Sequence, residues 1–538
     1  MTIWSLTNKA LVTVALLATA CMDLDVVNEN EPDRNRALSD PVDVEALAGS
    51  NFVILYTRLH RSDSWINPLS PMGDEFTATY ANNATLEVAN EPRIQLNNTP
   101  GTDASDISRN GWSDINSIVV NSNEVLAAIA GGMVIETPDA NGEPADNTQR
   151  ARGFAYLMRG IGYGYLANVW DKASVITHED TLPADPAALN AFVIERHKPY
   201  PEVLAQAVAD LDSAIAIFQR NNVTLPDHWI PTRAYTSADL VRIANSYIAR
   251  FMVYNARTPT ERNQVNWQRV LTATAAGITA DFGPILQPGV LSSSTFLSRA
   301  QTAGTFVMRA DYKLVGPADV SGNFQNWLRT PVHQRTRFNI TTPDRRITGA
   351  TPTSSGTYFR YRADDNGFRS DRGTYNFSAY QWFRRAGNSN TGTLIMFGVD
   401  ELRLLRAEAF LRTGNTVEAA NLVNVSRTRT QRIGATTFPG LPAVTPTGVL
   451  QTTTCVPRNA QGACGTLAEA LMYERMIEAA GSDPVRAWLD SRGWGRLPEG
   501  TILHLPIPGR ELQSLQLPLY TFGGVGGQGA AARGMWDL

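Results

Sequence analysis

The feature that most constrains the fold of this chain is a helical spacing of apolar residues that returns along the sequence. Phe154, Met158, Ile161, Tyr165 and Val169 follow one another at intervals of three and four residues, as one face of an α-helix requires. The same spacing predicts helices over 201–218, 237–254, 266–278, 401–412 and 417–429. Repeated amphipathic helices favour a mainly α fold, because each helix must bury its apolar face against neighbours.

Four glycines, Gly153, Gly160, Gly162 and Gly164, lie within the first of these helices. A glycine costs a helix about 1 kcal/mol relative to alanine. Four of them therefore predict a helix that another element approaches closely and that tertiary packing maintains.

The last two predicted helices form a hairpin with a turn at Gly414. The offsets of a tetratricopeptide repeat, in which small and large residues alternate across such a turn, are matched by Ala407, Phe410, Gly414, Ala419 and Val423. Pairing 151–169 with 201–218, and 237–254 with 266–278, extends this hairpin into a stacked array that inserts interrupt. The sequence thus predicts tetratricopeptide-like helical hairpins that form a scaffold.

Between residues 283 and 393 the sequence changes to Ser, Thr, Gly, Asn and Arg, with scattered aromatics and no sustained helical period. Long irregular segments are usually functional or disordered, and the many aromatics argue against disorder. We expect a large, ordered, loop-rich insert with short strands. The predicted organisation is a signal peptide over 1–20, an N-terminal helical region over 21–236, and a C-terminal region over 237–538 that contains the insert at about 283–393.

The chain begins with signals for export and lipidation. Lys9 follows a short polar head, and an apolar stretch then ends on small residues beside Cys21. This order is typical of a cleaved secretory signal, and the stretch is shorter than the roughly 20 apolar residues that cross a bilayer. Leu17 to Cys21 resembles a lipobox, so we predict lipid on Cys21, whose acyl chains would hold the protein at a membrane. The alternative is an ordinary signal peptide cut near Ala20.

The two other cysteines are Cys455 and Cys464, and an exported compartment allows them to bridge. The segment between them is rich in turn-forming residues. A local disulfide is therefore favoured over a metal site, which would need more Cys or His nearby.

Several function classes find no support in the sequence. A net charge of −4 without a basic block does not favour a nucleic-acid partner. The six histidines are scattered singly, and there is no Gly-Lys-Ser/Thr phosphate loop. Gly524 to Gly529 matches the dinucleotide fingerprint formally, but no room remains for the helix and strand that must follow, so a glycine-rich loop is expected. No catalytic residue, cofactor or metal site is predicted.

Adjacent acids occur at Asp74-Glu75 and Asp364-Asp365. A glycosidase needs two carboxyl groups roughly 5–10 Å apart across a cleft, whereas neighbouring acids are common on loops. Asp364 and Asn366 suit calcium, but the run lacks the EF-hand pattern, so a turn is the favoured interpretation.

Eight segments carry a further signal through their order along the chain. They are Cys21 to Asp33, Trp112 to Asn123, Arg152 to Trp170, Tyr200 to Ile215, Glu401 to Asn415, Glu474 to Glu478, Trp488 to Asp490, and Leu505 to Leu512. Together they resemble the SusD/RagB family of outer-membrane nutrient-binding lipoproteins over nearly the whole chain after Cys21. The most specific match is Glu401 to Asn415, while Trp170 to Ala173 and Ala480 to Arg486 depart from the family pattern.

This resemblance implies a helical fold with tetratricopeptide units and a lipoprotein exposed on the outer membrane. It implies a SusC-like TonB-dependent transporter as partner, for which the protein acts as a lid. It also implies binding of a nutrient, typically a glycan, without catalysis.

Sugar recognition uses flat aromatic faces with amide, hydroxyl and charged groups nearby. That mixture occurs in two loop-rich stretches, and the predicted ligand-binding residues are Trp65, Tyr80, Trp327, Tyr361, Tyr375 and Trp382. The alternative for each is that it packs a loop onto the scaffold. By contrast, residues expected in the core, because they lie on helical faces, are Trp112, Trp170, Trp267 and Trp488.

The leading hypothesis is therefore a cell-surface lipoprotein that binds a nutrient, a glycan or oligosaccharide first of all, and passes it to a TonB-dependent transporter. Three alternatives stay open. They are a relative that binds peptides or other solutes, a structural tetratricopeptide lipoprotein of the envelope, and a lipoprotein hydrolase.

Overall fold

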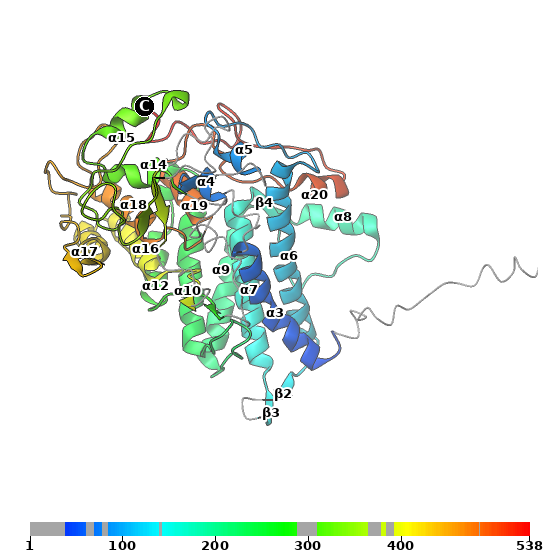
Figure 1. Cartoon of the computed structure of the whole chain (residues 1–538). Helices are drawn as coiled ribbons and strands as arrows, with labels where there is room; N and C mark the ends of the chain where they lie inside the picture. Colours follow the sequence, from blue (N-terminus) through cyan, green and yellow to red (C-terminus); the bar gives the residue numbers. More distant parts are fainter. Residues whose placement is uncertain are drawn as a thin grey trace, which may run out of the picture.

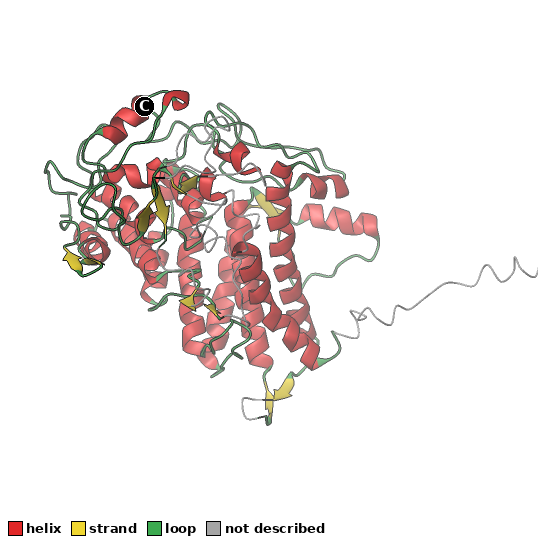
Figure 2. Ribbon diagram, viewed as in Figure 1, coloured by secondary structure: helices red, strands yellow, loops and turns green. Residues whose placement is uncertain are grey.

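The computed structural model describes residues 38–60, 69–77, 84–138, 142–287, 309–363, 378–383, 392–483 and 485–538. Within these ranges the chain is mainly helical, and the strands are short (Figure 2). The prediction of a mainly α fold is confirmed. No helix in the described part of the chain is long and apolar enough to cross a membrane.

Long helices form a bundle at one side of the molecule, with their axes roughly aligned (Figure 1). They are α3 (Pro41–His60), α6 (Asp103–Ala130), α7 (Thr148–Val169), α9 (Tyr200–Arg220) and α10 (Ser237–Tyr254). α7 lies at the centre of the bundle and packs against each of the other four. The periodicity predicted α7, α9 and α10 to within a few residues at each end.

The four glycines of α7 are the points at which its neighbours approach. An added Cβ would lie 2.6 Å from Phe218 of α9 at Gly153, 2.8 Å from Leu211 of α9 at Gly160, 2.9 Å from Val119 of α6 at Gly162, and 2.1 Å from Phe251 of α10 at Gly164. The close approach predicted from these glycines is confirmed. Three different helices, α6, α9 and α10, approach α7 at these glycines.

Two buried arginines cap the C-terminal ends of α7 and α10. Arg257 donates to the carbonyl oxygens of Ala167 at 2.7 Å and Trp170 at 3.0 Å, and Arg492 donates to those of Asn168 at 2.6 Å and Tyr254 at 2.8 Å. The carbonyl ends of both helices carry partial negative charge, which compensates these cations. Burial nevertheless lowers the pKa of Arg257 to about 10.

After the bundle the chain forms shorter helices. They are α11 (Pro259–Asn263), α12 (Trp267–Ala275), α16 (Val399–Arg412), α17 (Thr416–Arg427), α18 (Leu467–Glu478) and α19 (Arg486–Trp494). Of these, α12, α16 and α19 pack against α10 of the bundle. α16 and α17 pack as the predicted hairpin, and Gly414 at their turn has a φ of +86°, which glycine adopts without strain. Helices on both sides of residue 236 pack against one another, so the domain boundary placed there stays a prediction.

The remaining helical segments are short. They are α4 (Leu69–Met72), α5 (Thr85–Ala89), α8 (Pro186–Glu195), α14 (Tyr312–Val315), η2 (Gly316–Ala318), α15 (Asn323–Arg329), η3 (Val332–Gln334) and α20 (Gly509–Ser514). Four of them, from α14 to η3, lie in the insert, where the sequence had predicted only loops and strands.

The described strands pair only as two-stranded antiparallel ladders. These are β1 (Phe76–Thr77) with β7 (Arg309–Ala310), β2 (Glu136–Pro138) with β3 (Pro144–Asp146), β4 (Lys172–Ser174) with β5 (His197–Pro199), β6 (Ile285–Leu286) with β10 (Gly392–Thr393), β8 (Phe359–Tyr361) with β9 (Tyr380–Trp382), and β11 (Gln431–Ile433) with β12 (Thr436–Phe438). The insert therefore contains short strands, as predicted, but no extended sheet among its described residues.

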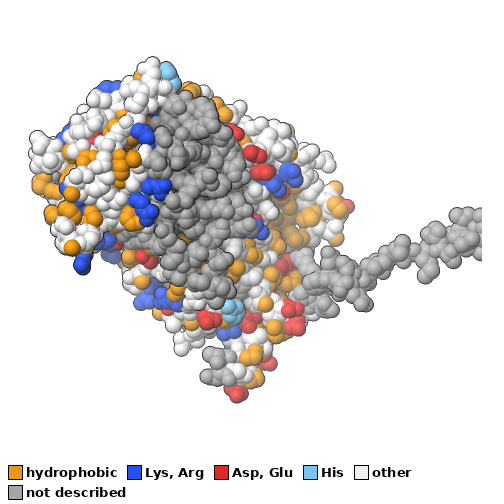
Figure 3. Space-filling model, viewed as in Figure 1, with side chains coloured by type: hydrophobic (Ala, Val, Ile, Leu, Met, Phe, Trp, Pro, Cys, Tyr) orange, Lys and Arg blue, Asp and Glu red, His pale blue; other side chains and the backbone are white. Residues whose placement is uncertain are grey.

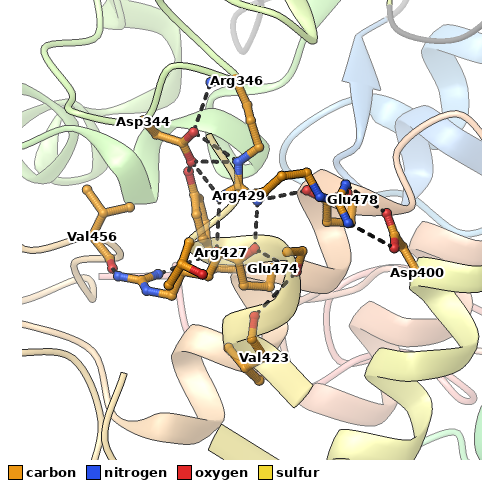
Figure 4. A network of polar contacts seen from close by, with 12 residues as sticks. Asp344, Arg346, Asp400, Val423, Arg427, Arg429, Val456, Glu474 and Glu478 are labelled. Atoms are coloured by element: carbon orange, nitrogen blue, oxygen red, sulfur yellow. Dashed lines mark hydrogen bonds and ion pairs between the residues drawn. The ribbon is translucent and has the colours of Figure 1, made fainter. Parts of the chain in front are cut away.

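A buried network of ion pairs holds the insert on the scaffold (Figure 4). Arg346 of the insert contacts Asp344 at 2.7 Å, Glu474 at 2.6 Å and Glu478 at 3.0 Å, and the two glutamates belong to α18. The hydroxyl of Tyr358 also donates to Glu478 at 3.0 Å. A buried guanidinium needs this set of partners, because desolvation of a lone charge is very costly.

Cys455 and Cys464 are joined by a disulfide, the arrangement that the sequence favoured. Arg427 at the end of α17 donates to the carbonyl oxygen of Val456, next to this bridge, and contacts Glu474 at 3.4 Å. The bridged loop is thus tied to the same network as the insert (Figure 4).

Candidate functional site: an aromatic and basic surface of the insert

The candidate site is built on the hairpin of β8 and β9. Its register pairs Phe359 with Trp382 and Tyr361 with Tyr380, so all four aromatic side chains share one face. Phe359, Tyr380 and Trp382 are buried, whereas Tyr361 at the end of β8 is half-buried. The ring of Tyr361 meets Tyr380 edge-on, with 5.9 Å between centroids. The hairpin thus presents the Tyr361 ring at the rim of a buried aromatic cluster.

Polar groups surround Tyr361. Its hydroxyl donates to Oδ1 of the exposed Asn339 at 3.3 Å. Arg337 is exposed two residues earlier, and its Nη1 donates to the carbonyl oxygen of Ala363 at 3.5 Å. A partly exposed ring with an amide and a guanidinium beside it can pack against the apolar side of a sugar and hydrogen-bond its hydroxyls.

An aromatic stack fixes the segment that carries Asn339. Phe338 stacks on Tyr312 with 4.3 Å between centroids, and the Tyr312 hydroxyl donates to the Phe338 carbonyl oxygen at 2.6 Å. Trp327 packs against Tyr312 at 5.1 Å, and the guanidinium of Arg335 lies 4.1 Å from the Trp327 ring centroid. Burial raises the pKa of Tyr312, so its hydroxyl stays protonated and continues to donate.

A buried charge cluster ties this stack to the N-terminal half. Arg335 lies 3.4 Å from Glu91, and Lys313 pairs with both Glu91 and Asp74. Burial alone would raise the pKa of Glu91, but the charges of Lys313 and Arg93 outweigh it and lower the pKa to about 2. Glu91 is therefore ionised at neutral pH, and it holds two cations of the insert.

Several predicted residues lie outside the described part of the chain. These are Cys21, Trp65, Tyr80 and Tyr375, together with the acids Asp364 and Asp365. Lipidation of Cys21 and ligand binding by the three aromatics stay predictions.

The structure corrects two of the predicted ligand-binding residues. Trp327 is 4% exposed and Trp382 is 3% exposed, and both belong to the hydrophobic core. Trp382 packs against Phe76 at 6.2 Å, and its indole lies 2.8 Å from where a Cβ at Gly481 would be. Neither ring has a free face, so both pack the insert onto the scaffold, which was the alternative. Among the described candidates, Tyr361 alone keeps part of its ring accessible.

Other residues named in the sequence analysis lie in different surroundings. The tryptophans predicted for the core are all buried, namely Trp112, Trp170, Trp267 and Trp488. Asp74 and Glu75 are buried and pair with Arg93 and Arg486. Gly524 to Gly529 forms turns and no helix follows it. The described residues include no group of three or more His, Cys, Asp or Glu side chains placed to hold a metal ion.

The sequence interpretation missed Arg337, Phe338 and Asn339. They lie in an irregular segment between η3 and Asp344 and have no periodic pattern. The available signal was their composition, a basic, an aromatic and an amide residue in succession.

Cavities of two kinds occur among the described residues. Two clefts are small, with volumes of about 60 Å³ beside α4 and α5 and about 20 Å³ beside α18. On this measure one water molecule needs about 10–15 Å³, so both clefts are small. An open groove of about 750 Å³ lies where α9 ends and α10 begins, lined by Arg220, Asn221, Asn222 and Arg242. It is large enough for a ligand, but its one aromatic residue, Phe218, is buried.

Several solved structures have a similar architecture. A SusD superfamily protein from Bacteroides vulgatus aligns with a TM-score of 0.52 at 14% identity, over 89% of this chain and 97% of that one. A SusD-like carbohydrate binding protein from the same species gives 0.52 at 14% identity, over 93% and 94%. A SusD homolog from Bacteroides uniformis gives 0.52 at 15% identity, over 87% and 94%.

No protein-family model and no curated protein matches the sequence. The likeness therefore lies in the fold, which spans nearly the full length of both chains in each alignment. The chain has the SusD-like fold, and the resemblance seen in the order of its sequence segments is confirmed at that level.

Proposed function

We propose that this protein is a lipid-anchored cell-surface protein that binds a nutrient, first of all a glycan, and passes it unchanged to a TonB-dependent outer-membrane transporter. The observation that carries the proposal is the SusD-like fold over nearly the whole chain, shared with a protein described as carbohydrate binding. The insert of this fold offers a half-buried tyrosine ring with an amide and a guanidinium beside it.

The geometry favours capture at an open surface. Tyr361 provides a ring face for the apolar side of a sugar, and Asn339 and Arg337 provide hydrogen bonds to its hydroxyls. The stack of Phe338 on Tyr312 and the pairing of Arg335 with Glu91 hold these groups in place before a ligand arrives. Such preorganisation lowers the entropic cost of binding.

A direct test is affinity electrophoresis of the protein without its signal against a panel of soluble polysaccharides, with peptides of similar length in parallel. Retardation by at least one glycan, and its loss in Tyr361→Ala, is the expected result. Binding of peptides alone would favour the peptide-binding alternative. Binding of neither would favour a structural tetratricopeptide lipoprotein.

Catalysis is tested on the same samples. Each polysaccharide is incubated with the purified protein, and the products are separated by size. We expect the chain lengths to stay unchanged. Shortened products would establish the hydrolase alternative.

Lipid anchoring and the transporter partner have to be tested in the cell that makes the protein. Wild type should fractionate with the outer membrane and co-purify with a transporter barrel, while Cys21→Ala should be released from the membrane fraction. Retention of Cys21→Ala in that fraction would contradict the lipid anchor, and purification without a barrel would contradict the proposed partner.

A further inference from the structure

The insert differs in charge from the rest of the chain. Residues 283–393 contain thirteen arginines and one lysine, against six aspartates and no glutamate. The whole chain carries a net charge of −4, so all other segments together are strongly acidic. A local excess of one sign creates a field that concentrates ligands of the opposite sign.

Some of these cations serve the fold. Lys313 and Arg335 pair with Glu91, and Arg346 pairs with Glu474 and Glu478, all from outside the insert. Arg345 donates to the carbonyl oxygens of Thr342 and Gly349. Lys313, Arg335 and Arg346 are buried or nearly so, Arg345 is half-buried, and the role of all four is structural.

The remaining charges of the described insert are arranged unevenly. Its three aspartates, Asp311, Asp319 and Asp344, are all buried. Arg329 and Arg337 are exposed, and Arg360 and Arg362 are half-buried. The charged side chains that this part of the insert presents to solvent are therefore arginines.

The arginines lie on both faces of the hairpin that carries the candidate binding residue. Arg337 reaches the carbonyl oxygen of Ala363, two residues after Tyr361. Arg360 and Arg362 alternate with Tyr361 along the chain and lie on the other face of the hairpin, where the Arg360 guanidinium packs over the Phe383 ring and Arg362 donates to Gln381. The space-filling view shows Lys and Arg prevailing at the loop-rich end of the molecule, with most of the acidic side chains in view on its other parts (Figure 3).

From this arrangement we propose that the nutrient is an anionic glycan, a chain whose sugars carry carboxylate or sulfate groups. Tyr361 packs against a sugar ring, Arg337 binds an acidic substituent of that sugar, and the arginines on the other face of the hairpin bind those of neighbouring sugars. The proposal rests on the proposed function and names its ligand class.

The choice of arginine over lysine supports this ligand class. A guanidinium is planar and offers parallel N–H donors, which match the two oxygens of a carboxylate or sulfate group. Every cation exposed or half-buried in the described insert is an arginine, and the single lysine, Lys313, is buried in the charge cluster. Salt weakens association that depends on such contacts, because the screening length at 0.1 M ionic strength is about 10 Å.

The test uses two polymers with one backbone. Polygalacturonate is anionic, and its fully methyl-esterified form is neutral. Dextran sulfate and dextran form a second pair that separates sulfate from carboxylate, and poly-glutamate supplies anionic charge without sugar. Equilibrium binding to the mature wild-type protein is measured for each polymer at low and physiological salt.

Three variants locate the contact. Arg337→Gln with Arg360→Gln removes two insert cations, Arg220→Gln alters the open groove at α9, and Arg510→Gln removes an exposed cation from the distant α20. Circular dichroism verifies that each variant is folded.

We expect the anionic member of at least one polymer pair to bind about tenfold more tightly than its neutral partner, and salt to reduce the difference. The double arginine variant should lose about fivefold or more in affinity for the anionic polymer, while Arg510→Gln and Arg220→Gln keep wild-type affinity; tenfold corresponds to about 1.4 kcal/mol.

Equal binding of charged and neutral partners would overturn the anionic preference and leave the proposed function intact. Equal binding of poly-glutamate would overturn the glycan class, and a loss of affinity only in Arg220→Gln would overturn the location. Binding of no glycan, charged or neutral, would contradict the proposed function itself.

Discussion

The helical bundle and the insert are held together by different physics. In the bundle, α7 packs against its neighbours through glycines, and apolar side chains such as Phe251 fill the contacts. In the insert, short segments without a helical period are held by buried ion pairs and stacked aromatics, of which Arg346 with Glu474 is the most connected example. Apolar packing needs only shape, whereas a buried ion pair also needs every partner present.

This difference assigns separate tasks to the two regions. Loops positioned on a rigid scaffold are the usual place for binding residues. The bundle supplies rigidity, and the ion pairs allow a loop-rich segment to be ordered without a regular sheet or helix of its own. The exposed arginines and Tyr361 can then face solvent in a fixed arrangement.

The largest effect should follow removal of the central guanidinium of the insert. Arg346→Met leaves Asp344, Glu474 and Glu478 buried with fewer partners, so the free energy of unfolding should fall by about 3–5 kcal/mol. Urea unfolding followed by circular dichroism measures it. The matched control is Arg345→Met, the adjacent arginine that bonds to backbone carbonyls, and a loss as large there would contradict the network account.

A smaller effect is expected from overpacking the bundle. Gly164→Ala places a methyl group 2.1 Å from the Phe251 ring, and the forced shift should cost about 1–3 kcal/mol. Thermal unfolding measures it. Gly131→Ala at the end of α6, where the nearest atom lies at 3.4 Å, should change stability little. Similar losses at both positions would remove the argument for close helix contacts.

The ion pairs of Glu91, which tie the insert to the N-terminal half, should weaken at low pH. The pKa of Glu91 is about 2 in the folded protein, below the ordinary glutamate value of 4.5, so its stabilisation is complete above pH 4.5 and is lost as pH falls towards 2. Glu91→Gln should remove about 3 kcal/mol of this pH-dependent stability. Stability measured between pH 7 and pH 2 should show a flatter acid limb for the variant, and identical limbs would contradict the assignment.

The smallest effect should come from one hydroxyl of the insert. Tyr358→Phe removes the hydrogen bond to Glu478 but leaves the ion pair of Glu478 with Arg346, so a loss of about 1 kcal/mol is expected. Denaturant unfolding measures this change. A loss equal to that of Arg346→Met would show that the hydroxyl, and not the guanidinium, holds the network.

The bundle was the more predictable region, because its helices expose one face and bury the other. Periodicity placed α10 at its observed bounds, and the glycines of α7 predicted close packing. Periodicity did not give the bounds of α19, although Trp488 was expected on a helical face, because all nine residues of this helix are buried and charged ones such as Arg486 and Asp490 stand among them. A helix buried on every side through ion pairs has no amphipathic pattern.

The insert was predictable in character but not in detail. Composition indicated an ordered aromatic surface, yet Trp327 and Trp382 are buried in the core. Which aromatic keeps a free face depends on how loops fold over one another, and no local pattern records that. The partners of the insert's arginines were equally hard to predict, because neighbours such as Arg345 and Arg346 have different surroundings.

Hydrogen exchange with and without a bound glycan tests the central claim most directly, because it reports on both regions in one experiment. The ligand is the polysaccharide that binds most tightly in the panel. The account predicts slower exchange around residues 337–339 and 359–363, with the bundle helices unchanged. Protection confined to the groove at residues 218–222 and 236–242, or none in the insert, would contradict it.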